Sequence, residues 1–255
     1  MHHNIGNPKI STNRKALSPL AIAIIVIGVI VVVVAAVALF WYSPGTPRTE
    51  TMTFTDFTTI EAGSAFQVII TESESYSVKI TAGERIFDRI QVTQTGEILK
   101  IETMPITVFG AFDAKAEIAM PRLNRLDISG ATRATVTGFS TTEPFFATVT
   151  GASSLEMTNV EFGNVNFQVS GASHIVAEGT GNDLVGDVSG ASNLDLTDFH
   201  VNDANVNVSG ASHATVNLDG RLDVDASGLS NLEYIGEPTL GTINTSGGSN
   251  VNKKW

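Results

Sequence analysis

Residues 168–174 read QVSGASH, residues 187–193 read DVSGASN and residues 207–213 read NVSGASH. Aligned on its central glycine, this segment occurs seven times at nearly regular intervals. A period near 20 residues, sustained over about 120 residues, indicates a repeat architecture rather than one local site. The seven corner glycines are Gly130, Gly151, Gly171, Gly190, Gly210, Gly228 and Gly247.

The residues on either side of each glycine alternate between apolar and polar, as in half-buried β-strands. Val169 and Val208 stand two positions before their glycines, and Ile175 and Ala214 stand four positions after them. We predict an all-β, single-domain parallel β-helix, or solenoid, with two short strands per coil joined at a Gly-Ala-Ser corner. The glycine gives the corner its backbone freedom, and the serine hydroxyl bonds backbone groups that the bend leaves unpaired.

Residues 50–125 lack the SGAS corner, but they contain five strand-like segments separated by turn signals. We interpret them as the first, irregular part of the same solenoid, which closes one end, and residues 126–255 as its regular repeats. At the other end, Lys253, Lys254 and Trp255 are expected to protect the last exposed strand. The five segments read MTFTDFTTI, AFQVIIT, YSVKITA, EILKIET and AKAEIAM.

An apolar run precedes this domain. Residues 20–40 include no charged side chain. A helix of this length spans roughly 31 Å, close to the thickness of the hydrocarbon core of a bilayer. We predict one transmembrane α-helix over residues 20–42. Its apolar run extends from Leu20 to Phe40, and Trp41 and Tyr42 form an interfacial anchor. The preceding RKALSP resembles the start of pilin-like leaders, so processing before the helix is the alternative.

The charges on the two sides of this helix predict its orientation. The first 43 residues contain Lys9, Arg14 and Lys15 and no acidic residue, so 12 of the 15 basic and all 26 acidic residues follow them. Because basic flanks stay inside, we expect a cytoplasmic tail (1–19), a linker (43–49) and an extracellular domain (50–255) of a single-pass plasma-membrane protein. An acidic exterior opposes nucleic acid as a partner. The chain has no cysteine, which excludes disulfides and thiolate metal sites.

Several longer segments are similar to one known family. They are FTTIEAGSAFQVIITESESYSVKI (57–80), EILKIE (97–102), MPRLNRLDISGAT (120–132) and a closing block at 221–251 that contains SGLSNLEYIGEP. Over residues 53–252 the chain resembles the family called putative auto-transporter adhesin, head GIN domain. The resemblance implies a β-helical, extracytoplasmic domain of an adhesin-like protein. It carries no catalytic residue over to this sequence.

Two sets of residues are candidate metal sites. The residues three positions after each glycine should stack along the solenoid. His174 and His213 would then lie two coils, or about 10 Å, apart, which is too far for one metal ion, so we expect polar residues facing water. This ladder comprises Arg133, Ser154, His174, Asn193, His213, Asn231 and Asn250. A face with Glu156, Asp187, Asp195, Asp198 and Asp203 is a candidate calcium site, but we expect it to be a solvated acidic surface.

Catalysis finds little support in the sequence. Between Arg133 and Arg221 there is no Lys or Arg. Parallel β-helix polysaccharide lyases use a basic residue to take a proton beside calcium, and this chain offers only Arg133 and Arg221, at the borders of the repeats. Asn207 and Asn244 begin N-glycosylation sequons, whose serines also belong to SGAS corners.

We therefore expect a non-enzymatic, membrane-anchored surface module with no catalytic residue and no cofactor apart from the calcium candidate. Its partner would be a glycan, an envelope polymer or a protein, bound through many shallow polar contacts along the coils. A polysaccharide-active enzyme on the same scaffold is one alternative. An architectural or signalling subunit of the cell envelope, acting through the cytoplasmic tail, is another.

Overall fold

The computed structural model describes residues 46–104 and 114–255. The predicted transmembrane helix, its anchor residues Leu20, Phe40, Trp41 and Tyr42, and the predicted tail lie outside these residues. Within the two described ranges, no helix is both long enough and apolar enough to cross a membrane. The orientation of the chain across a membrane therefore stays a prediction.

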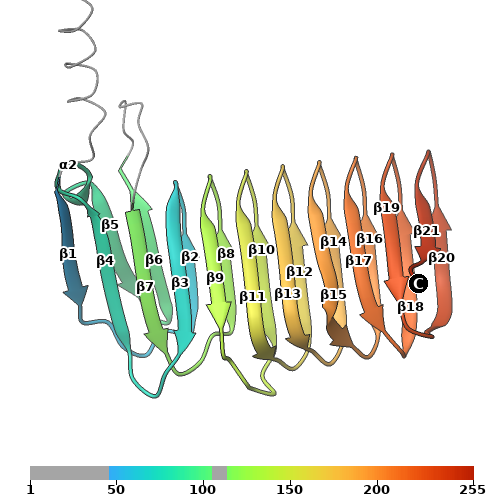
Figure 1. Ribbon diagram of the computed structural model, residues 1–255, viewed down its shortest axis with the longest axis horizontal. Helices are drawn as coiled ribbons and strands as arrows, with labels where there is room; N and C mark the ends of the chain where they lie inside the picture. The colour runs from blue at the N-terminus through green and yellow to red at the C-terminus, as the bar shows by residue number, and fades with distance from the viewer. Residues whose placement is uncertain (1–45, 105–113) are drawn as a thin grey trace, which may run out of the picture. The chain divides into compact units, whose positions relative to one another are not determined.

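Two β-sheets face each other across one hydrophobic core (Figure 1). Sheet A contains, in spatial order, β1 (Pro47–Met52), β4 (Ser77–Gly83), β7 (Ala114–Met120), β3 (Phe66–Glu72), β9 (Arg133–Thr137), β11 (Ser154–Glu161), β13 (His174–Thr180), β15 (Asn193–Val201), β17 (His213–Leu218), β19 (Asn231–Ile235) and β21 (Asn250–Lys253). Sheet B contains β20 (Thr239–Thr245), β18 (Arg221–Ala226), β16 (Ala204–Val208), β14 (Leu184–Val188), β12 (Val165–Val169), β10 (Phe145–Val149), β8 (Arg125–Ile128), β2 (Thr59–Ala62), β6 (Ile98–Thr103) and β5 (Ile90–Thr95).

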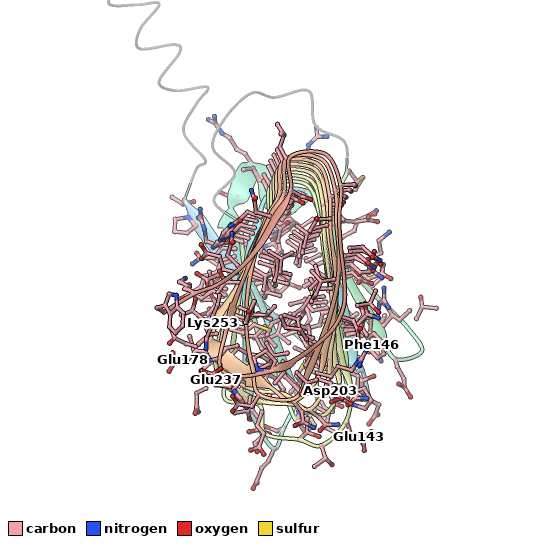
Figure 2. All side chains as sticks on the ribbon, turned by 90° about the vertical axis from the view of Figure 1, so that its right-hand side faces the viewer. Glu143, Phe146, Glu178, Asp203, Glu237 and Lys253 are labelled. Carbon is pink, nitrogen blue, oxygen red and sulfur yellow. The ribbon has the colours of Figure 1, made fainter. Side chains whose placement is uncertain are left out.

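From β8 to β21 the chain winds as a parallel solenoid, and each coil contributes one strand to each sheet. Successive strands pair in parallel, so equivalent residues stack: Val149, Val169, Val188 and Val208 lie opposite one another in neighbouring strands of sheet B. All four are buried. Seen end-on, inward-facing side chains fill the space between the two sheets (Figure 2). The predicted all-β parallel solenoid is confirmed.

The SGAS segments form one edge of the solenoid, here called the corner edge, where each joins a strand of sheet B to the next strand of sheet A in four residues. All seven corner glycines have positive φ. The backbone N–H after one glycine donates to the carbonyl oxygen of the glycine one coil earlier, as from Ala191 to Gly171 at 2.8 Å. The serine that follows is buried, and Ser212 Oγ accepts the backbone N–H of Ser192 at 3.3 Å. Both roles predicted for the corner residues are therefore confirmed.

The other edge, here called the opposite edge, consists of the turns 138–144, 162–164, 181–183, 202–203, 219–220 and 236–238. Aromatic rings fill the core beside it. Phe145 and Phe162 stack with ring centroids 4.4 Å apart, and Phe167 contacts Phe145 and Phe199 edge-on. The differing lengths of these turns, together with register shifts in β11, β13 and β15, account for the slightly unequal intervals between corners.

The first part of the domain closes one end of the solenoid with antiparallel strands. β1 pairs with β4, β4 with β7 and β5 with β6, all antiparallel. The coil made of β2 and β3 lies between the coil of β6 and β7 and the coil of β8 and β9, so spatial order departs from chain order. A strand that runs in the reverse direction ends the parallel winding, which is why the solenoid stops here.

Four of the five predicted strand segments coincide with β3, β4, β6 and β7. The fifth, at 52–60, is wrong as a single strand, because Asp56 has φ of +61° and turns the chain so that Phe57 enters the core beside Tyr76. β1 begins at Pro47, inside the stretch interpreted as a linker. The short helix α2 (Glu84–Phe87) and strand β5 were not predicted.

At the other end, β20 and β21 are the last strands of their sheets. The Lys253 ammonium lies 2.5 Å from a carboxylate oxygen of Glu237 and 4.6 Å from the ring centroid of Trp255. Lys254 lies 3.7 Å from Glu233. These charges lie beside the last strand, where we expect residues that protect an exposed sheet edge.

Candidate functional site

The outer face of sheet B carries columns of equivalent side chains. From β2 to β18 the register is unbroken, so each outward residue lies directly beside its counterpart on the next coil, about 4.8 Å away. Hydroxyl, amide and carboxylate groups therefore form one line, here called the central column. It contains Glu61, Asp127, Thr148, Gln168, Asp187, Asn207, Asp225 and Asn244.

Parts of the central column are fixed by hydrogen bonds between coils. Asn207 Nδ2 donates to Asp187 Oδ1 at 2.8 Å, and Asn244 Nδ2 donates to Asp225 Oδ1 at 2.7 Å. Asn207 and Asn244 are also the two predicted glycosylation acceptors. Both are exposed, but their amide nitrogens are engaged with a carboxylate. The bonds hold the oxygens and amides in fixed positions facing solvent.

A neighbouring column, closer to the opposite edge, adds apolar surface. It passes through Phe146, Asn166, Val185 and Asn205 in register. Phe146 is 42% exposed and Val185 is 44% exposed. In the end-on view Phe146 lies on the outer side of its sheet (Figure 2). Sequence reasoning missed this ring, although the alternation in FFATV, with Phe145 inside, indicates that Phe146 faces outward.

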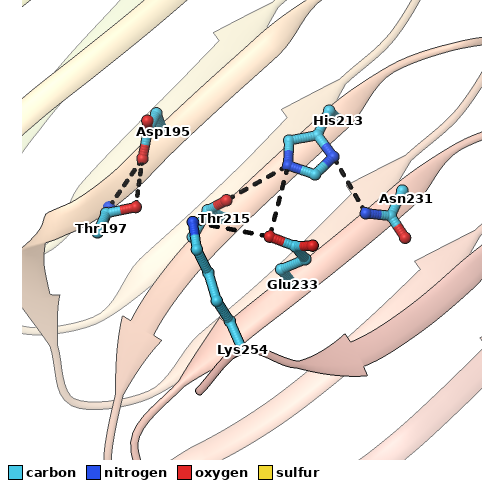
Figure 3. Close-up of polar contacts among 7 residues, drawn as sticks. All are labelled: Asp195, Thr197, His213, Thr215, Asn231, Glu233 and Lys254. Atoms are coloured by element: carbon cyan, nitrogen blue, oxygen red, sulfur yellow. Dashed lines mark hydrogen bonds and ion pairs between the residues drawn. The ribbon is translucent and has the colours of Figure 1, made fainter.

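On the outer face of sheet A, the predicted ladder from Arg133 to Asn250 is in register, strand by strand. Asn193 lies between His174 and His213 in the ladder, and its side-chain amide donates to His174 Nδ1 at 2.9 Å. The side-chain amide of Asn231 donates to His213 Nδ1 at 3.1 Å (Figure 3). The two histidines thus lie two coils apart, as predicted. Within residues 46–104 and 114–255, no group of three or more His, Cys, Asp or Glu side chains is placed to hold a metal ion.

Asp195 lies near this ladder on the same face. Burial by itself raises the pKa of Asp195, but the Thr197 backbone N–H at 3.0 Å and hydroxyl at 2.6 Å donate to its Oδ1 (Figure 3). The net effect lowers the pKa below its ordinary value, because these donors stabilise the carboxylate. Asp195 therefore holds the start of a bend in β15.

The five acidic residues of the candidate calcium face do not share a face, so together they do not form one calcium site. Glu156, Asp195 and Asp198 belong to strands of sheet A, whereas Asp187 belongs to sheet B and Asp203 to the opposite edge. Asp187 and Asp203 already accept hydrogen bonds, Asp203 from the backbone N–H of Arg221 at 2.7 Å. The corner reverses the chain between the two sheets, which separates acids that are close in sequence.

The two nominal catalytic arginines are also apart. Arg133 begins β9 in sheet A, and Arg221 begins β18 in sheet B. Arg221 pairs with Asp223 through two hydrogen bonds of 2.6 and 2.8 Å. The pair does not combine with Arg133 into one site.

Solved structures with the same fold are known. The chain matches a crystal structure of a putative adhesin from Bacteroides fragilis at 19% identity and TM-score 0.76, covering 83% of this chain and 99% of that one. A putative adhesin and a putative lipid binding protein from Parabacteroides distasonis match at 16% and 15% identity, with TM-scores of 0.64 and 0.58. These cover 82% and 83% of this chain and 98% of each of the other two. At such identities the likeness shows the fold.

No curated protein matches the chain. A family described as putative auto-transporter adhesin, head GIN domain, matches residues 56–238, from just before β2 to just before β20. The match agrees with the resemblance read from the corner motifs and the closing block. It covers well over half of the sequence, and the chain therefore belongs to this family.

Proposed function

We propose that the chain is a cell-surface binding module that holds an extended, hydroxyl-rich polymer, such as an envelope glycan, along the outer face of sheet B. The module is non-enzymatic, and residues 20–42 anchor it to the plasma membrane with the solenoid outside. The observation that carries the proposal is the unbroken register of this face, which repeats amide, carboxylate and hydroxyl groups at one spacing from β2 to β18.

The chemistry of the face fits such a ligand. Amides and hydroxyls both donate and accept hydrogen bonds, and carboxylates accept them, so the central column complements a row of sugar hydroxyls. The exposed ring of Phe146 and the side chain of Val185 cover apolar C–H surface between the polar contacts. Each contact is weak, and affinity comes from many of them along one polymer.

Other classes of protein have less support. The solved neighbours are named as adhesins and as a lipid binding protein rather than as enzymes. An enzyme would need a proton acceptor beside the bound polymer, and the predicted candidates Arg133 and Arg221 lie on different sheets. An architectural or signalling role would act through residues 1–19, which lie outside the described part of the chain.

The proposal is tested with residues 44–255, a compact unit with its own core. The protein is passed over immobilised envelope and plant polysaccharides, with calcium or with chelator, and both retention and new sugar ends are measured. We expect retention without cleavage. Loss of retention in chelator would mean that binding needs calcium. Release of new sugar ends would mean that the protein is an enzyme rather than a binding module.

A matched pair of variants locates the binding face. Gln168 and Gln67 are both exposed glutamines that face outward from one position inside the end of a strand, on sheet B and sheet A respectively. We expect Gln168→Ala, combined with Phe146→Ala, to weaken retention by about tenfold and Gln67→Ala to leave it unchanged. Equal effects of the two changes would remove sheet B from the proposal.

A further inference from the structure

The outer face of sheet B is hollowed near its first coils. A hollow of about 270 Å³, open on one side, lies over β6, β2, β8 and β10. Its position on the central column places it on the face that the proposed function assigns to the polymer. Its lining residues are Glu61, Ala62, Gly63, Lys100, Glu102, Asp127, Ile128, Ser129, Thr148 and Thr150.

Gly63 creates the hollow. In the following coils the residue at this position, directly after the sheet B strand, is a serine or threonine, as at Ser129, Thr150 and Ser170. A Cβ atom at Gly63 would lie 3.3 Å from Ser129 Oγ, and Gly63 is not among the residues with positive φ. The backbone conformation therefore does not require glycine there, and the column carries no side chain at this coil, although a side chain at Gly63 would have to displace the Ser129 hydroxyl slightly.

The charges around the hollow are largely balanced. Lys100 lies 3.0 Å from Glu102, and Arg125 Nε donates to Asp127 Oδ2 at 2.7 Å. Glu61 is the remaining carboxylate of the lining. The other oxygen of Asp127, Oδ1, is buried and has no hydrogen-bond partner among the residues that the structure describes. A buried acceptor without a donor is costly unless a ligand or water supplies one.

We propose that this hollow binds a single neutral sugar unit, the terminal residue of the polymer that sheet B holds. The inference rests on the proposed function, because it takes the ligand to be a glycan. The oxygens of Glu61 and Asp127 accept sugar hydroxyl protons, and Lys100 donates to a sugar oxygen. The hydroxyls of Thr148 and Thr150 do both. Because two of the three carboxylates are already paired with cations, a hydroxyl-bearing ligand fits better than a cationic one.

The size and surroundings of the hollow agree with one sugar unit. Its volume lies just below the range of about 300–1,000 Å³ that is usual for small-molecule pockets. Phe146 lies on the same strand as Thr148, two residues away, and its exposed ring offers an apolar surface to the next unit. The polymer would then run from the hollow toward β18 along the central column.

The test fills the hollow without changing a charge. Gly63→Thr places a side chain in the empty position of the column, and Ser189→Thr adds a methyl group at the equivalent position of β14, outside the hollow. Residues 44–255 are titrated with methyl glycosides of common hexoses and N-acetylhexosamines, and amide NMR shifts are followed. In parallel, retention on the polysaccharides is measured for both variants, after circular dichroism has shown that both are folded.

The proposal expects amide shifts at Ser129 and Thr150 for at least one methyl glycoside. Gly63→Thr should weaken that binding by about tenfold or more, whereas Ser189→Thr should leave it within about twofold. Glu61→Gln, which keeps the size of a half-buried side chain and removes one strong acceptor, should also weaken binding. If Gly63→Thr does not fold, the binding measured for Glu61→Gln alone tests the site.

The outcomes separate this inference from the proposed function. Retention of a polysaccharide that Gly63→Thr and Glu61→Gln leave unchanged would overturn the hollow as a site while the binding module stands. If the wild-type protein retains no polysaccharide, the binding module falls. The titration then tests whether the hollow binds sugar. Amide shifts that a methyl glycoside causes and Gly63→Thr abolishes would support the site, and the absence of such shifts would overturn it.

Discussion

At the corner edge each of the seven reversals uses four residues, whereas at the opposite edge the reversals between β9 and β20 use from two to seven. The corner edge repeats glycine and serine at every coil. The opposite edge varies in sequence as well as in length. Both edges reverse the same chain between the same two sheets, so the difference must come from what each turn contacts.

At the corner edge, backbone lies directly against backbone. A Cβ atom at Gly190 would lie 2.5 Å from the carbonyl oxygen of Gly171, which is inside van der Waals contact. At the opposite edge, backbone also approaches backbone in some coils, as where a Cβ atom at Gly163 would lie 2.2 Å from the carbonyl oxygen of Thr142, but side chains add contacts that differ from coil to coil. Asp183 Oδ1 accepts the backbone N–H of Asp203, and Asp203 Oδ1 accepts that of Arg221.

The two edges therefore differ in how much sequence variation a solenoid tolerates there. A contact between two backbones has one geometry, so it requires one residue type at one spacing in each coil. A side chain can reach across a variable gap, so a turn held by carboxylates accommodates insertions. The SGAS motif therefore marks the edge where the same close backbone contact repeats at every coil, and substitutions there should have large effects.

Gly190→Ala should be strongly destabilising. The new methyl group meets the Gly171 carbonyl, and alanine is strained at φ of +81°. We expect the free energy of unfolding to fall by about 3 kcal/mol, of which left-handed backbone strain accounts for roughly 1–2 kcal/mol. Urea unfolding of residues 44–255 measures the loss.

The control for this change is Gly138→Ala, at the opposite edge. Gly138 also has positive φ, but its nearest neighbour would be Glu72 Cβ at 3.8 Å, an ordinary contact. This variant should show only the cost of the backbone strain, about 1–2 kcal/mol. Equal losses at Gly190 and Gly138 would mean that the close backbone approach adds nothing to the cost.

Ser212→Ala should have a smaller effect at the same edge. The change removes the acceptor for the buried N–H of Ser192 and should lower the free energy of unfolding by about 1–2 kcal/mol. Ser209→Ala, in the same corner but on the outer side, should change stability by less than about 0.5 kcal/mol. Thermal unfolding of the two variants side by side checks the difference, and a larger loss at Ser209 would reverse the assignment of the two serines.

The fold could be predicted from the corner because the corner is constrained by backbone contact. Every corner repeats the glycine, most follow it with a small residue and serine, and the alternation on either side then indicated two strands. The opposite edge gave no such signal, because its turns differ in length and its contacts between coils, by backbone and by side chain, differ from coil to coil. The antiparallel pairing of β4 and β5 was also not predictable, since a strand carries no local mark of its direction.

The sites were less predictable than the fold. The sequence contained enough information to reject the acidic face: Asp187 precedes the corner at Gly190 and Asp195 follows it, so the two must lie on different sheets. The hollow needed the structure. It brings together residues of β2, β6 and β8, and β2 lies between the other two strands against chain order.

The smallest effect should come from a carboxylate near the opposite edge. Hydrogen bonds from Arg221, and then from the Thr242 backbone N–H, lower the pKa of Asp223 from 3.8 to about 2. Because the folded-state pKa is lowered, the stabilisation is complete above about pH 4 and is lost as the pH falls through about 2. Carboxyl NMR titration should show the pKa of Asp223 rising toward 3.8 in Arg221→Ala, with little change in stability at pH 7, since the pair is exposed to solvent. A pKa that stays near 2 in this variant would mean that the Thr242 N–H alone holds the carboxylate, and that the contact between coils at this edge needs no arginine.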